Sequence, residues 1–327
     1  MNDIMADIVA VGELLVDFTC SESDGEIIYK QNAGGAPANV ACMASKLGAS
    51  TGFIGKIGRD MFGFYLKKIL YENKVDTKGL ILDPNYSTSL AFIHNDEEGD
   101  RDFVFYRTPQ TAADLNLRYG EVNRELIDSC KILHFGSLSL NAEPSKTATL
   151  NAVEYAKMQG KLISYDPNWR PLLWESSEAG IKAMRNAAQY ADIIKASEKE
   201  LQLLTDCGAL IPGVARLLET GVKIICITQG AKGCVIATPK GIERYPAYKV
   251  KSVDTLGSGD SFFGAFLYKL LELEKSPEEL DGDDILEMAM FSNACGALCS
   301  TKQGAIPAMP SKEDILKLME TVKPERA

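Results

Sequence analysis

Residues 254–266 place two glycines, a hydroxyl and a carboxylate at the start of an apolar run of helical length. Gly257 and Gly259 allow the backbone to turn its N–H groups toward an anion, and a helix expected from about Ser261 adds the positive end of its dipole. A carboxylate at this position would repel phosphate unless it takes a proton from the group that attacks the phosphate. An anion hole combined with Asp260 as general base is therefore typical of a kinase.

A simpler interpretation of the same segment is a tight loop before a core helix, with Asp260 as the N-cap. The segment is not a dinucleotide-binding fingerprint, because the third glycine of G-x-G-x-x-G would fall on Phe262, which is too large for close packing of helix and strand. The chain also contains no G-x-x-x-x-G-K-[ST] motif. ATP would therefore be bound without a P-loop.

The composition, 46% apolar and 24% charged, is ordinary for a soluble globular enzyme. The net charge of −10 and the isoelectric point near 4.9 disfavour nucleic acid and anionic membranes as partners, but not ATP, which needs only a local positive potential. The segment before Lys30 has no basic residue, and no apolar run approaches the length of a membrane span. We therefore expect a cytoplasmic protein.

Eight cysteines are scattered along the chain without a C-x-x-C pair, and several lie in apolar runs. This distribution favours reduced, buried thiols over disulfides. Cys295 and Cys299 would share one face of a helix. Because the chain has only two histidines, core packing is favoured over a metal site at this pair.

Apolar runs of strand length alternate with helical stretches. The runs lie at 8–11, 132–135, 162–165, 193–195 and 224–227, and the helical stretches lie near 62–73, 144–159, 178–189 and 198–204. Continuous apolar strands joined by helices are typical of a mostly parallel sheet covered by helices on both faces. We therefore expect an α/β fold in which ligands bind at the carboxyl ends of the strands.

Two segments interrupt this alternation. Residues 16–31 and 88–106, the latter with a polar turn at 95–101, are predicted to form β-strands in an antiparallel arrangement without helical crossovers. Their exposed edges favour pairing with a second subunit. Helices are expected at 261–273 and 283–300, and a last helix begins at Ser311, where Asp314 completes a capping box.

A second glycine cluster, Asn-Ala-Gly-Gly-Ala-Pro-Ala-Asn at residues 32–39, continues into residues 40–48 and 53–60. Residues 34–63 resemble the first signature of the ribokinase (PfkB) family of carbohydrate kinases, and residues 254–266 resemble the second. The resemblance covers nearly the whole chain. Within the family, the segments 12–17, 103–107, 134–140, 165–170 and 192–198 are similar to those of bacterial and plant fructokinases. The 2-keto-3-deoxygluconate kinases share several of these features and remain the main alternative.

The resemblance implies a ribokinase-like fold as a single domain, residues 1–327. Its central, mostly parallel β-sheet would carry helices on both faces. Segments of about 16–31 and 88–107 would form a small β-sheet lid over the sugar. In the family this lid often serves as a dimer interface, which implies a homodimer.

The resemblance also assigns residues to the acceptor sugar, namely Asp17, Gly34, Gly35 and Asn39. Their chemistry suits this role, because a carboxylate and an amide form directional hydrogen bonds and glycines admit a sugar ring close to the backbone. Asp17 has a simpler interpretation as a turn residue after a strand. Asn39 could merely satisfy loop carbonyls.

Arg107 follows the second lid strand, where its guanidinium could swing over the sugar or screen phosphate oxygens. The matching arginine of the 2-keto-3-deoxygluconate kinases suits a carboxylate substrate, so Arg107 does not separate the two acceptors. Residues 108–109 and 112–114 resemble the fructokinase pattern of a proline followed by Ala-Asp, although residues 110–111 depart from it. This pattern favours fructose.

The nucleotide-binding positions implied by the resemblance are Asn168, Arg170, Ser197, Thr228, Gly230, Gly233, Gly257, Gly259 and Asn293. Arg170 would also face the sugar, and it would supply the fixed positive charge that a P-loop lysine supplies elsewhere. The N-x-x-E motif of the family is Ser197-Glu-Lys-Glu200 in this chain. Glu200 keeps the carboxylate, which we expect to act on Mg²⁺ through waters.

A potassium site beside the anion hole is implied as well, formed by Asp254, the backbone of Leu256, and carbonyl groups near Cys299, Lys302 and Gly304. Ala308 replaces a serine ligand of that site. Whether the chain depends on K⁺ therefore stays open.

The favoured function is an ATP- and Mg²⁺-dependent kinase that phosphorylates the primary hydroxyl of D-fructose. Its catalytic residues would be Asp260 as base and Gly257, Ser258 and Gly259 as anion hole. One alternative is another acceptor, such as 2-keto-3-deoxygluconate. A different class is a non-catalytic sugar sensor on the same fold, which is disfavoured because this chain keeps both the base and the anion hole.

Overall fold

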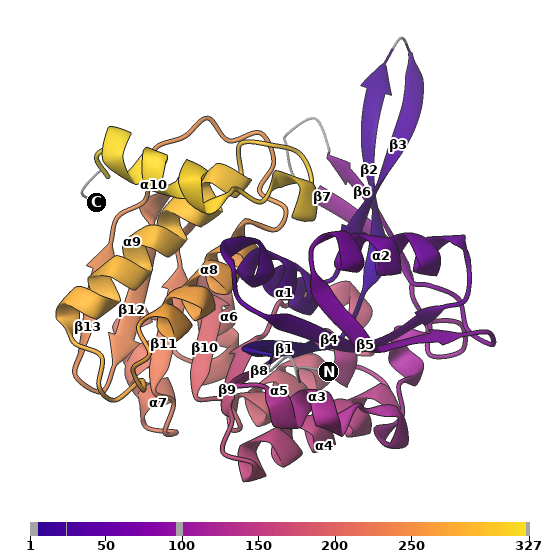
Figure 1. Ribbon diagram of the computed structural model, residues 1–327, viewed down its shortest axis with the longest axis horizontal. Helices are drawn as coiled ribbons and strands as arrows, with labels where there is room; N and C mark the ends of the chain where they lie inside the picture. The colour runs from indigo at the N-terminus through magenta and orange to yellow at the C-terminus, as the bar shows by residue number, and fades with distance from the viewer. Residues whose placement is uncertain (1–5, 24, 96–100, 325–327) are drawn as a thin grey trace.

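The computed structural model describes residues 6–23, 25–95 and 101–324. In this part of the chain, nine strands form a main sheet in the order β13-β12-β11-β10-β9-β8-β1-β4-β5 (Figure 1). Its strands are β1 (Ile8–Val11), β4 (Thr51–Gly58), β5 (Val75–Asp83), β8 (Ile132–Gly136), β9 (Leu162–Asp166), β10 (Ile193–Ser197), β11 (Ile224–Thr228), β12 (Cys234–Thr238) and β13 (Gly241–Tyr245). All pairs are parallel except those made by β12.

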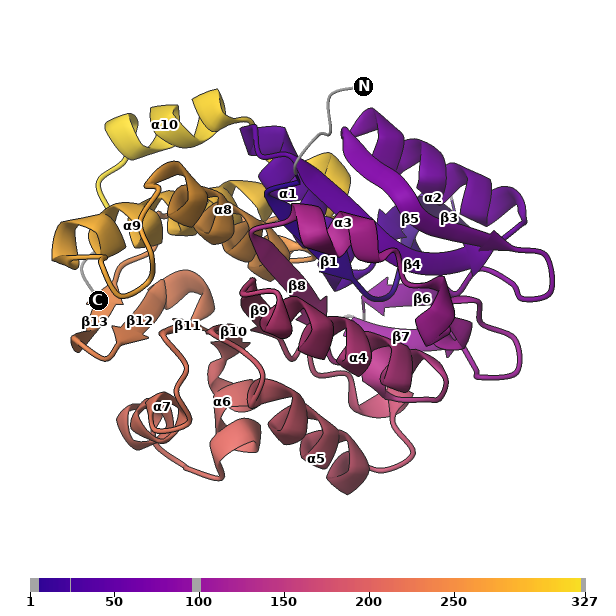
Figure 2. The same cartoon turned by 60° about the horizontal axis from the view of Figure 1, so that its bottom comes forward.

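Helices cover both faces of the main sheet, as Figure 2 shows. One face carries α1 (Ala36–Leu47), α2 (Met61–Glu72), α8 (Ser258–Glu272), α9 (Gly282–Cys299) and α10 (Lys312–Thr321). The other face carries α3 (Arg124–Ser129), α4 (Ser145–Met158), α5 (Ser177–Ala188), α6 (Glu198–Thr205) and α7 (Leu210–Leu218). In β1, Val9 and Val11 pack into one core while Ile8 and Ala10 pack on the opposite side. A strand buried on both faces needs a continuous apolar run, which explains the sequence pattern.

A small second sheet has the strand order β3-β2-β6-β7. It is built from β2 (Leu15–Ser23), β3 (Glu26–Gly34), β6 (Leu90–Asn95) and β7 (Arg101–Tyr106), and β2 and β3 project from the body of the protein (Figure 1). The pairs β2–β3 and β6–β7 are antiparallel as predicted, whereas β2 and β6 run parallel. Residues 96–100 of the predicted polar turn lie outside the described residues. The expected fold class, with a separate small sheet, is confirmed.

The predicted helices and strands are found to within one or two residues at each end, apart from the start of α8 and the end of β3, which are each three residues from the predicted bound. The capping box at Ser311 and Asp314 is present, and the Asp314 carboxylate accepts hydrogen bonds from the Ser311 N–H and hydroxyl. Strands β4, β5, β12 and β13 and helices α1, α3 and α7 were not predicted. Strand β4 is fully buried although three of its eight residues are glycines, so composition alone conceals it.

All eight cysteines are free thiols, and six of them are buried. Cys295 lies in the core with its sulfur 3.5 Å from the sulfur of Met43. In the described ranges, no single helix is long and apolar enough to cross a bilayer. Helices α6 and α7 reach that length only when taken together, and they are bent by 57° at the break between them.

Candidate active site

The N-terminal ends of α1 and α8 meet at one point of the molecule. The two helices approach closely because α8 carries Gly264, where an added Cβ would lie 2.7 Å from Met43 Cβ and 2.8 Å from the carbonyl oxygen of Val40. As a result, Asn39 Nδ2 of α1 donates a 2.8 Å hydrogen bond to Asp260 Oδ2 of α8. The two glycine motifs, separated by more than two hundred residues of sequence, therefore form one site.

The site is a cavity of about 270 Å³ between the main sheet and the small sheet. Eleven of the residues selected from the sequence line it, namely Asp17, Gly35, Asn39, Asn168, Arg170, Ser197, Glu200, Leu256, Gly257, Gly259 and Asp260. Sequence analysis missed Glu13 and Lys195, which also line it, together with Phe103 and Phe105 of β7. The cavity lies at the carboxyl ends of β9 and β10, as expected for this kind of sheet.

Helix α8 begins at Ser258, with Gly257 as its N-cap, three residues earlier than predicted. Asp260 therefore lies in the first turn, and the interpretation of Asp260 as the N-cap is wrong. Gly257 has φ = 74°, and an added Cβ would lie only 2.5 Å from Ala305 Cβ, so both conformation and space require glycine here. The hydrogen-bond ladder starts with the Ser261 N–H donating to the Gly257 carbonyl.

The helical ladder leaves the amide groups of Gly259 and Asp260 without an intrahelical acceptor, as in any first turn. These amides and the positive end of the helix dipole are what an anion hole needs. The Ser258 N–H instead donates to the Thr255 carbonyl. The Ser258 hydroxyl oxygen is buried and has no hydrogen-bond partner among the described residues.

Lys195 lies on β10 beside this helix terminus. Its Nζ donates a 2.8 Å hydrogen bond to Asp166 Oδ2 at the end of β9, and the Asp166 side chain is only 1% exposed. Burial by itself would lower the pKa of Lys195, but the carboxylates of Asp166, Glu200 and Asp260 outweigh it and raise this pKa, so the ammonium group stays charged. One signal of this residue was available in the sequence, since a lysine inside a buried apolar strand needs a partner.

Glu200 organises the turn at the end of β10. Its Oε2 accepts from the Ser197 N–H at 2.7 Å and from the Ser197 hydroxyl at 2.8 Å, and its Oε1 accepts from the Trp169 N–H at 2.7 Å. Burial alone would raise the pKa of Glu200, but the charge of Lys195 and these hydrogen bonds lower it. Glu200 is thus an ionised carboxylate that holds the segment after β9 against the start of α6.

The segment after β9 presents Asn168 and Arg170 to the cavity. Asn168 has φ = 43°, a left-handed conformation that asparagine tolerates, and its N–H donates to Asp166 Oδ1 at 3.1 Å. Arg170 Nη1 donates to the Trp169 carbonyl at 3.0 Å, and the guanidinium carbon lies 5.9 Å from the ring centre of Phe103. Arg170 therefore spans the cavity from the main sheet to the small sheet.

At the other end of the cavity, Asp17 lies directly against Gly34. A Cβ added to Gly34 would be 2.0 Å from Asp17 Oδ2, so only glycine leaves the carboxylate its place. Glu13 lies next to this pair and is almost completely buried. Its Oε1 accepts from the Ala36 N–H at 3.2 Å, whereas Oε2 has no hydrogen-bond partner in the described parts of the chain. Burial raises the pKa of Glu13 to about 7, although the nearby Arg107 opposes the shift.

Arg107 does not line the cavity, and it is not free to swing as predicted. Its Nε donates to Asp114 Oδ2 at 2.7 Å, and its Nη2 donates to the Leu138 carbonyl at 2.8 Å. Both side chains of this ion pair are buried, and the other oxygen of Asp114 accepts from the Ser89 hydroxyl. Asp114 therefore neutralises the charge that sequence analysis had assigned to the substrate.

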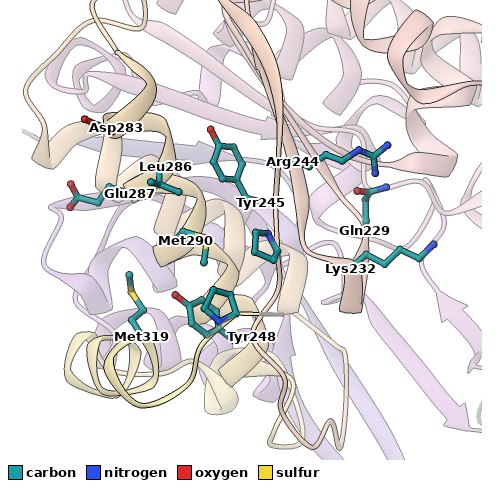
Figure 3. Close-up of a pocket in the computed structure, with 12 residues that line it drawn as sticks. Gln229, Lys232, Arg244, Tyr245, Tyr248, Asp283, Leu286, Glu287, Met290 and Met319 are labelled. Carbon is teal, nitrogen blue, oxygen red and sulfur yellow. The ribbon is translucent and has the colours of Figure 1, made fainter. Parts of the chain in front are cut away.

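A larger cavity of about 770 Å³ lies between α9 and the loop after β11 (Figure 3). Leu286 and Met290 line it from α9, Met319 from α10, and Gln229 and Lys232 from the opposite side. Among the predicted nucleotide residues, Thr228, Gly230 and Gly233 flank Gln229 and Lys232 without lining the cavity. Asn293 lies outside the lining as well, and its Nδ2 donates to the carbonyls of Tyr245 and Pro246 at 3.3 and 3.0 Å, thereby fixing the strand that forms the cavity wall.

The two cavities are related through the main sheet, because Ser197 of β10 and Thr228 of β11 are register partners. Ser197 lines the smaller cavity, and Gln229, the residue after Thr228, lines the larger one. Gln229 Nε2 also donates to Glu198 Oε1 at 2.8 Å. An elongated ligand with an apolar end and an anionic end can follow this row of strand termini toward the amides of α8.

The predicted potassium loop is held in a defined shape. Asp254 Oδ1 accepts from the Leu256 N–H and Oδ2 accepts from the Gly304 N–H, both at 2.9 Å. The Lys302 N–H donates to the Cys299 carbonyl at 3.4 Å. Within residues 6–23, 25–95 and 101–324, no cluster of three or more His, Cys, Asp or Glu side chains is arranged to hold a metal ion.

Comparison with known proteins gives a consistent result. Residues 5–312 match the model of the pfkB family of carbohydrate kinases. "Probable fructokinase-5" of Arabidopsis thaliana is 45% identical over 323 residues, which cover 96% of this chain and 97% of that protein.

Solved structures are similar over the same length. The fructokinase of Xylella fastidiosa with bound ATP superposes with a TM-score of 0.89 at 30% identity, covering 97% of this chain and 99% of that one. A double-mutant fructokinase of Vibrio cholerae with fructose, ADP and potassium ion bound superposes with a TM-score of 0.87 at 31% identity, covering 98% and 100%.

Proposed function

Because the chain belongs to the pfkB family of carbohydrate kinases, we propose that it is a fructokinase, which transfers the γ-phosphoryl group of ATP to D-fructose. The products are D-fructose 6-phosphate and ADP. The observation that carries this proposal is the 2.8 Å hydrogen bond from Asn39 to Asp260. It joins the end of the cavity that holds Asp17 to the amides at the start of α8, so a hydroxyl beside Asp260 would face an anion at those amides.

In the proposed step, the primary hydroxyl of the sugar attacks the γ-phosphorus of ATP. The new bond joins the sugar oxygen to phosphorus, the bond from phosphorus to the bridging oxygen breaks, and its electron pair stays on ADP. Asp260 accepts the hydroxyl proton. The amides of Gly259 and Asp260 lie outside the helical ladder and stabilise charge on the phosphoryl oxygens.

The nucleotide would occupy both cavities. Its adenosine part suits the larger cavity, because Tyr245, Tyr248, Leu286 and Met290 provide an apolar lining. Its phosphates would extend past Ser197 toward Gly259. Arg170 and Lys195 are the basic residues that line the smaller cavity, and they would face these phosphates.

Mg²⁺ would be carried by the nucleotide, where it would neutralise part of the phosphate charge. The donors of this chain fit an outer role, because both oxygens of Glu200 already accept protein hydrogen bonds, and contact through the waters of the metal would leave these bonds in place. K⁺ would be held by backbone carbonyls of the loop that Asp254 shapes. Ala308 has no side-chain oxygen for it.

The acceptor is argued from charge. Arg107, which would bind the carboxylate of 2-keto-3-deoxygluconate, is already paired with Asp114. The carboxyl groups of Glu13 and Asp17 line the same end of the cavity. An acid sugar would meet two acidic groups and an arginine already paired with Asp114, which leaves Arg170 near the small sheet to bind its carboxylate. A neutral sugar would meet hydrogen-bonding partners. The geometry therefore favours fructose.

A panel of acceptors assayed for ADP release tests this proposal. We expect kcat/KM for D-fructose to exceed that for 2-keto-3-deoxygluconate, ribose and adenosine by at least about tenfold. The Asp260→Asn variant is the control, since it should lose activity with every acceptor. Preference for the acid sugar would overturn the assignment to fructose, and absence of sugar-dependent ADP release would favour a sugar sensor.

A homodimer formed through the small sheet is part of the proposal. The face of this sheet away from the cavity is apolar and exposed at Ile27, Tyr29, Val104 and Tyr106, whose side chains are 64%, 49%, 52% and 65% exposed. Tyr29 and Tyr106 pack edge-on against Phe92 at the centre of the face. An apolar sheet face of this kind is typical of a subunit interface. Sedimentation should give a dimer for the wild type and a monomer for Ile27→Lys with Tyr106→Lys. A monomeric wild type would contradict the dimer.

We also propose a cytoplasmic location, supported by eight free thiols that a reducing compartment would preserve.

A further inference from the structure

Lys195 lies against the first turn of α8. A Cβ added to Gly259 would be 2.9 Å from Lys195 Nζ and 3.4 Å from its Cε. The ammonium group is therefore adjacent to the amides that form the anion hole, and Lys195 lines the same cavity as Gly259 and Asp260. A positive charge beside the positive end of a helix is unfavourable unless an anion lies between or beside them.

A buried ion pair with Asp166 holds Lys195 in this position. Its side chain is 10% exposed, and its partner Asp166, at 2.8 Å, is 1% exposed. Asp166 is further tied by the Asn168 N–H, which donates to its other oxygen at 3.1 Å. Only one of the three ammonium protons is directed to Asp166, so the group can still donate toward the cavity.

We propose that Lys195 is a catalytic residue whose ammonium group contacts the oxygens of the transferring phosphoryl group, and that Asp166 is the positioning residue that holds it there. This inference deepens the proposed phosphoryl transfer and rests on it. Lys195 stays protonated throughout the step. The proton of the sugar hydroxyl goes to Asp260, and the electron pair of the broken bond goes to ADP. The contribution of Lys195 is electrostatic, as a point charge that does not have to reorganise during the reaction.

Arg170, the cation assigned to this role from the sequence, is placed differently. It is only partly buried, one of its nitrogens is used by the Trp169 carbonyl, and its guanidinium lies near Phe103 of the small sheet. Lys195 comes from the main sheet and contacts the anion hole itself. The fixed cation that replaces a P-loop lysine is therefore Lys195, and Arg170 belongs to the part of the site that the lid covers.

The test compares two buried lysines of the same chain. Lys56 is also buried, and it pairs with Asp83 at 3.1 Å, but it does not line the cavity. We expect Lys195→Met to lower kcat by at least about a hundredfold while the KM for the sugar and the Kd for ADP change less than about threefold. The matched Lys56→Met variant should lose thermal stability without this loss of kcat. Equal losses in both variants would show a structural role and overturn the proposal.

Binding of a phosphoryl mimic separates a transition-state contact from folding. In calorimetry, Lys195→Met should bind ADP like the wild type but lose at least about tenfold in affinity for ADP with aluminium fluoride, which mimics the transferring group. Unchanged affinity for ADP with aluminium fluoride would overturn the proposal. This measurement needs no acceptor turnover, so it stands apart from the assignment of fructose.

Two further variants cover the case in which Lys195→Met does not fold. Lys195→Gln keeps a hydrogen bond to Asp166 without the charge, and it should show the same loss of kcat. Lys195→Ala leaves room for an external amine, and ethylammonium should restore kcat at least about fivefold in a saturable way. Wild-type kcat in a folded Lys195→Gln, or no rescue of Lys195→Ala by ethylammonium, would overturn the proposal. The assays use the acceptor that the panel identifies, so an error in the acceptor would not be mistaken for failure of Lys195.

Discussion

The two ends of the small cavity differ in the charges that their side chains carry. At the end formed by α8, the amides of Gly259 and Asp260 lie outside the helical ladder, and Lys195 is kept charged beside them. At the other end, the guanidinium of Arg107 is neutralised by Asp114, and Glu13 is buried with a raised pKa. A charged lysine therefore lies at the end where a phosphate would bind, whereas the arginine near the other end is paired with a carboxylate. The charge that a cavity offers to a ligand thus depends on which charged side chains are already paired within the protein, and not only on which charged residues lie near it.

The largest expected effect comes from filling the phosphate end. In Gly259→Val, the new Cβ would lie 2.9 Å from Lys195 Nζ, and the side chain would block the approach of a phosphate to the amides of the anion hole. Turnover should be abolished, while D-fructose should still raise the melting temperature, because a ligand that binds the folded state stabilises it.

Gly282→Val is a suitable control for this change. Gly282 also lies in the first turn of a helix, and nothing lies within 4 Å of a Cβ added there. If Gly259→Val loses protection by fructose together with turnover, the two ends are not separable and the variant is misfolded.

The next largest effect is expected from removing the carboxylate of Asp260, the residue that connects the two ends of the cavity through its hydrogen bond with Asn39. Asp260→Asn should leave the Kd for ATP within a few-fold but lower kcat by at least about a hundredfold, since general bases contribute factors of about 10²–10⁴. Calorimetry and steady-state assays measure the two quantities. A kcat close to that of the wild type would contradict the role of Asp260 as general base.

A third change restores charge at the sugar end. Asp114→Asn leaves the guanidinium of Arg107 uncompensated next to the cavity, so the ratio of kcat/KM for 2-keto-3-deoxygluconate to that for D-fructose should rise at least about tenfold. Some stability will be lost, because breaking a buried ion pair costs about 3–5 kcal/mol.

The control for the third change is Asp83→Asn, which weakens a different ion pair, that of the buried Lys56. It should lower the melting temperature without changing the ratio. An unchanged ratio in folded Asp114→Asn would mean that Arg107 does not govern the choice between the two acceptors.

The smallest effect concerns Glu13. Its pKa is raised from 4.5 to about 7 in the folded protein, so between these pH values the folded state binds more protons than the unfolded state, and stability falls as pH rises. The contribution of the protonated Glu13 carboxyl to the free energy of unfolding is fully present below pH 4.5 and is lost as the pH rises through about 7. The loss amounts to about 3 kcal/mol. Glu13→Gln should remove this slope.

Urea unfolding at several pH values gives the free energies of unfolding of the wild type and of Glu13→Gln. The pH dependence of their difference measures the effect of Glu13. The difference isolates Glu13 from other groups, because those groups titrate in both proteins. A constant difference would mean that the carboxyl group of Glu13 is already ionised in the folded state.

Much of the fold followed from local patterns. The apolar runs of β8 to β11 and the helical periodicity of α4 to α6 depend on neighbours in the sequence, and these elements were predicted with nearly correct bounds. The glycine-rich β4 was missed, because its burial on both faces comes from strands far away in the chain. The start of α8 was placed at Ser261 since three small or polar residues precede it, whereas packing of Gly257 against Ala305 begins the helix at Ser258.

The residue types that the chemistry requires could be read from the sequence: the glycines and carboxylate of residues 257–260, Asp17 and Asn39 as candidates for binding the acceptor, and the two signatures of the family. The pairing of the charges depends on the tertiary fold. Lys195 pairs with Asp166 across adjacent strands, and Arg107 pairs with Asp114. The physical reason is that a residue's type fixes which charge it can carry, but the strength and direction of that charge depend on burial and on partners brought together by folding.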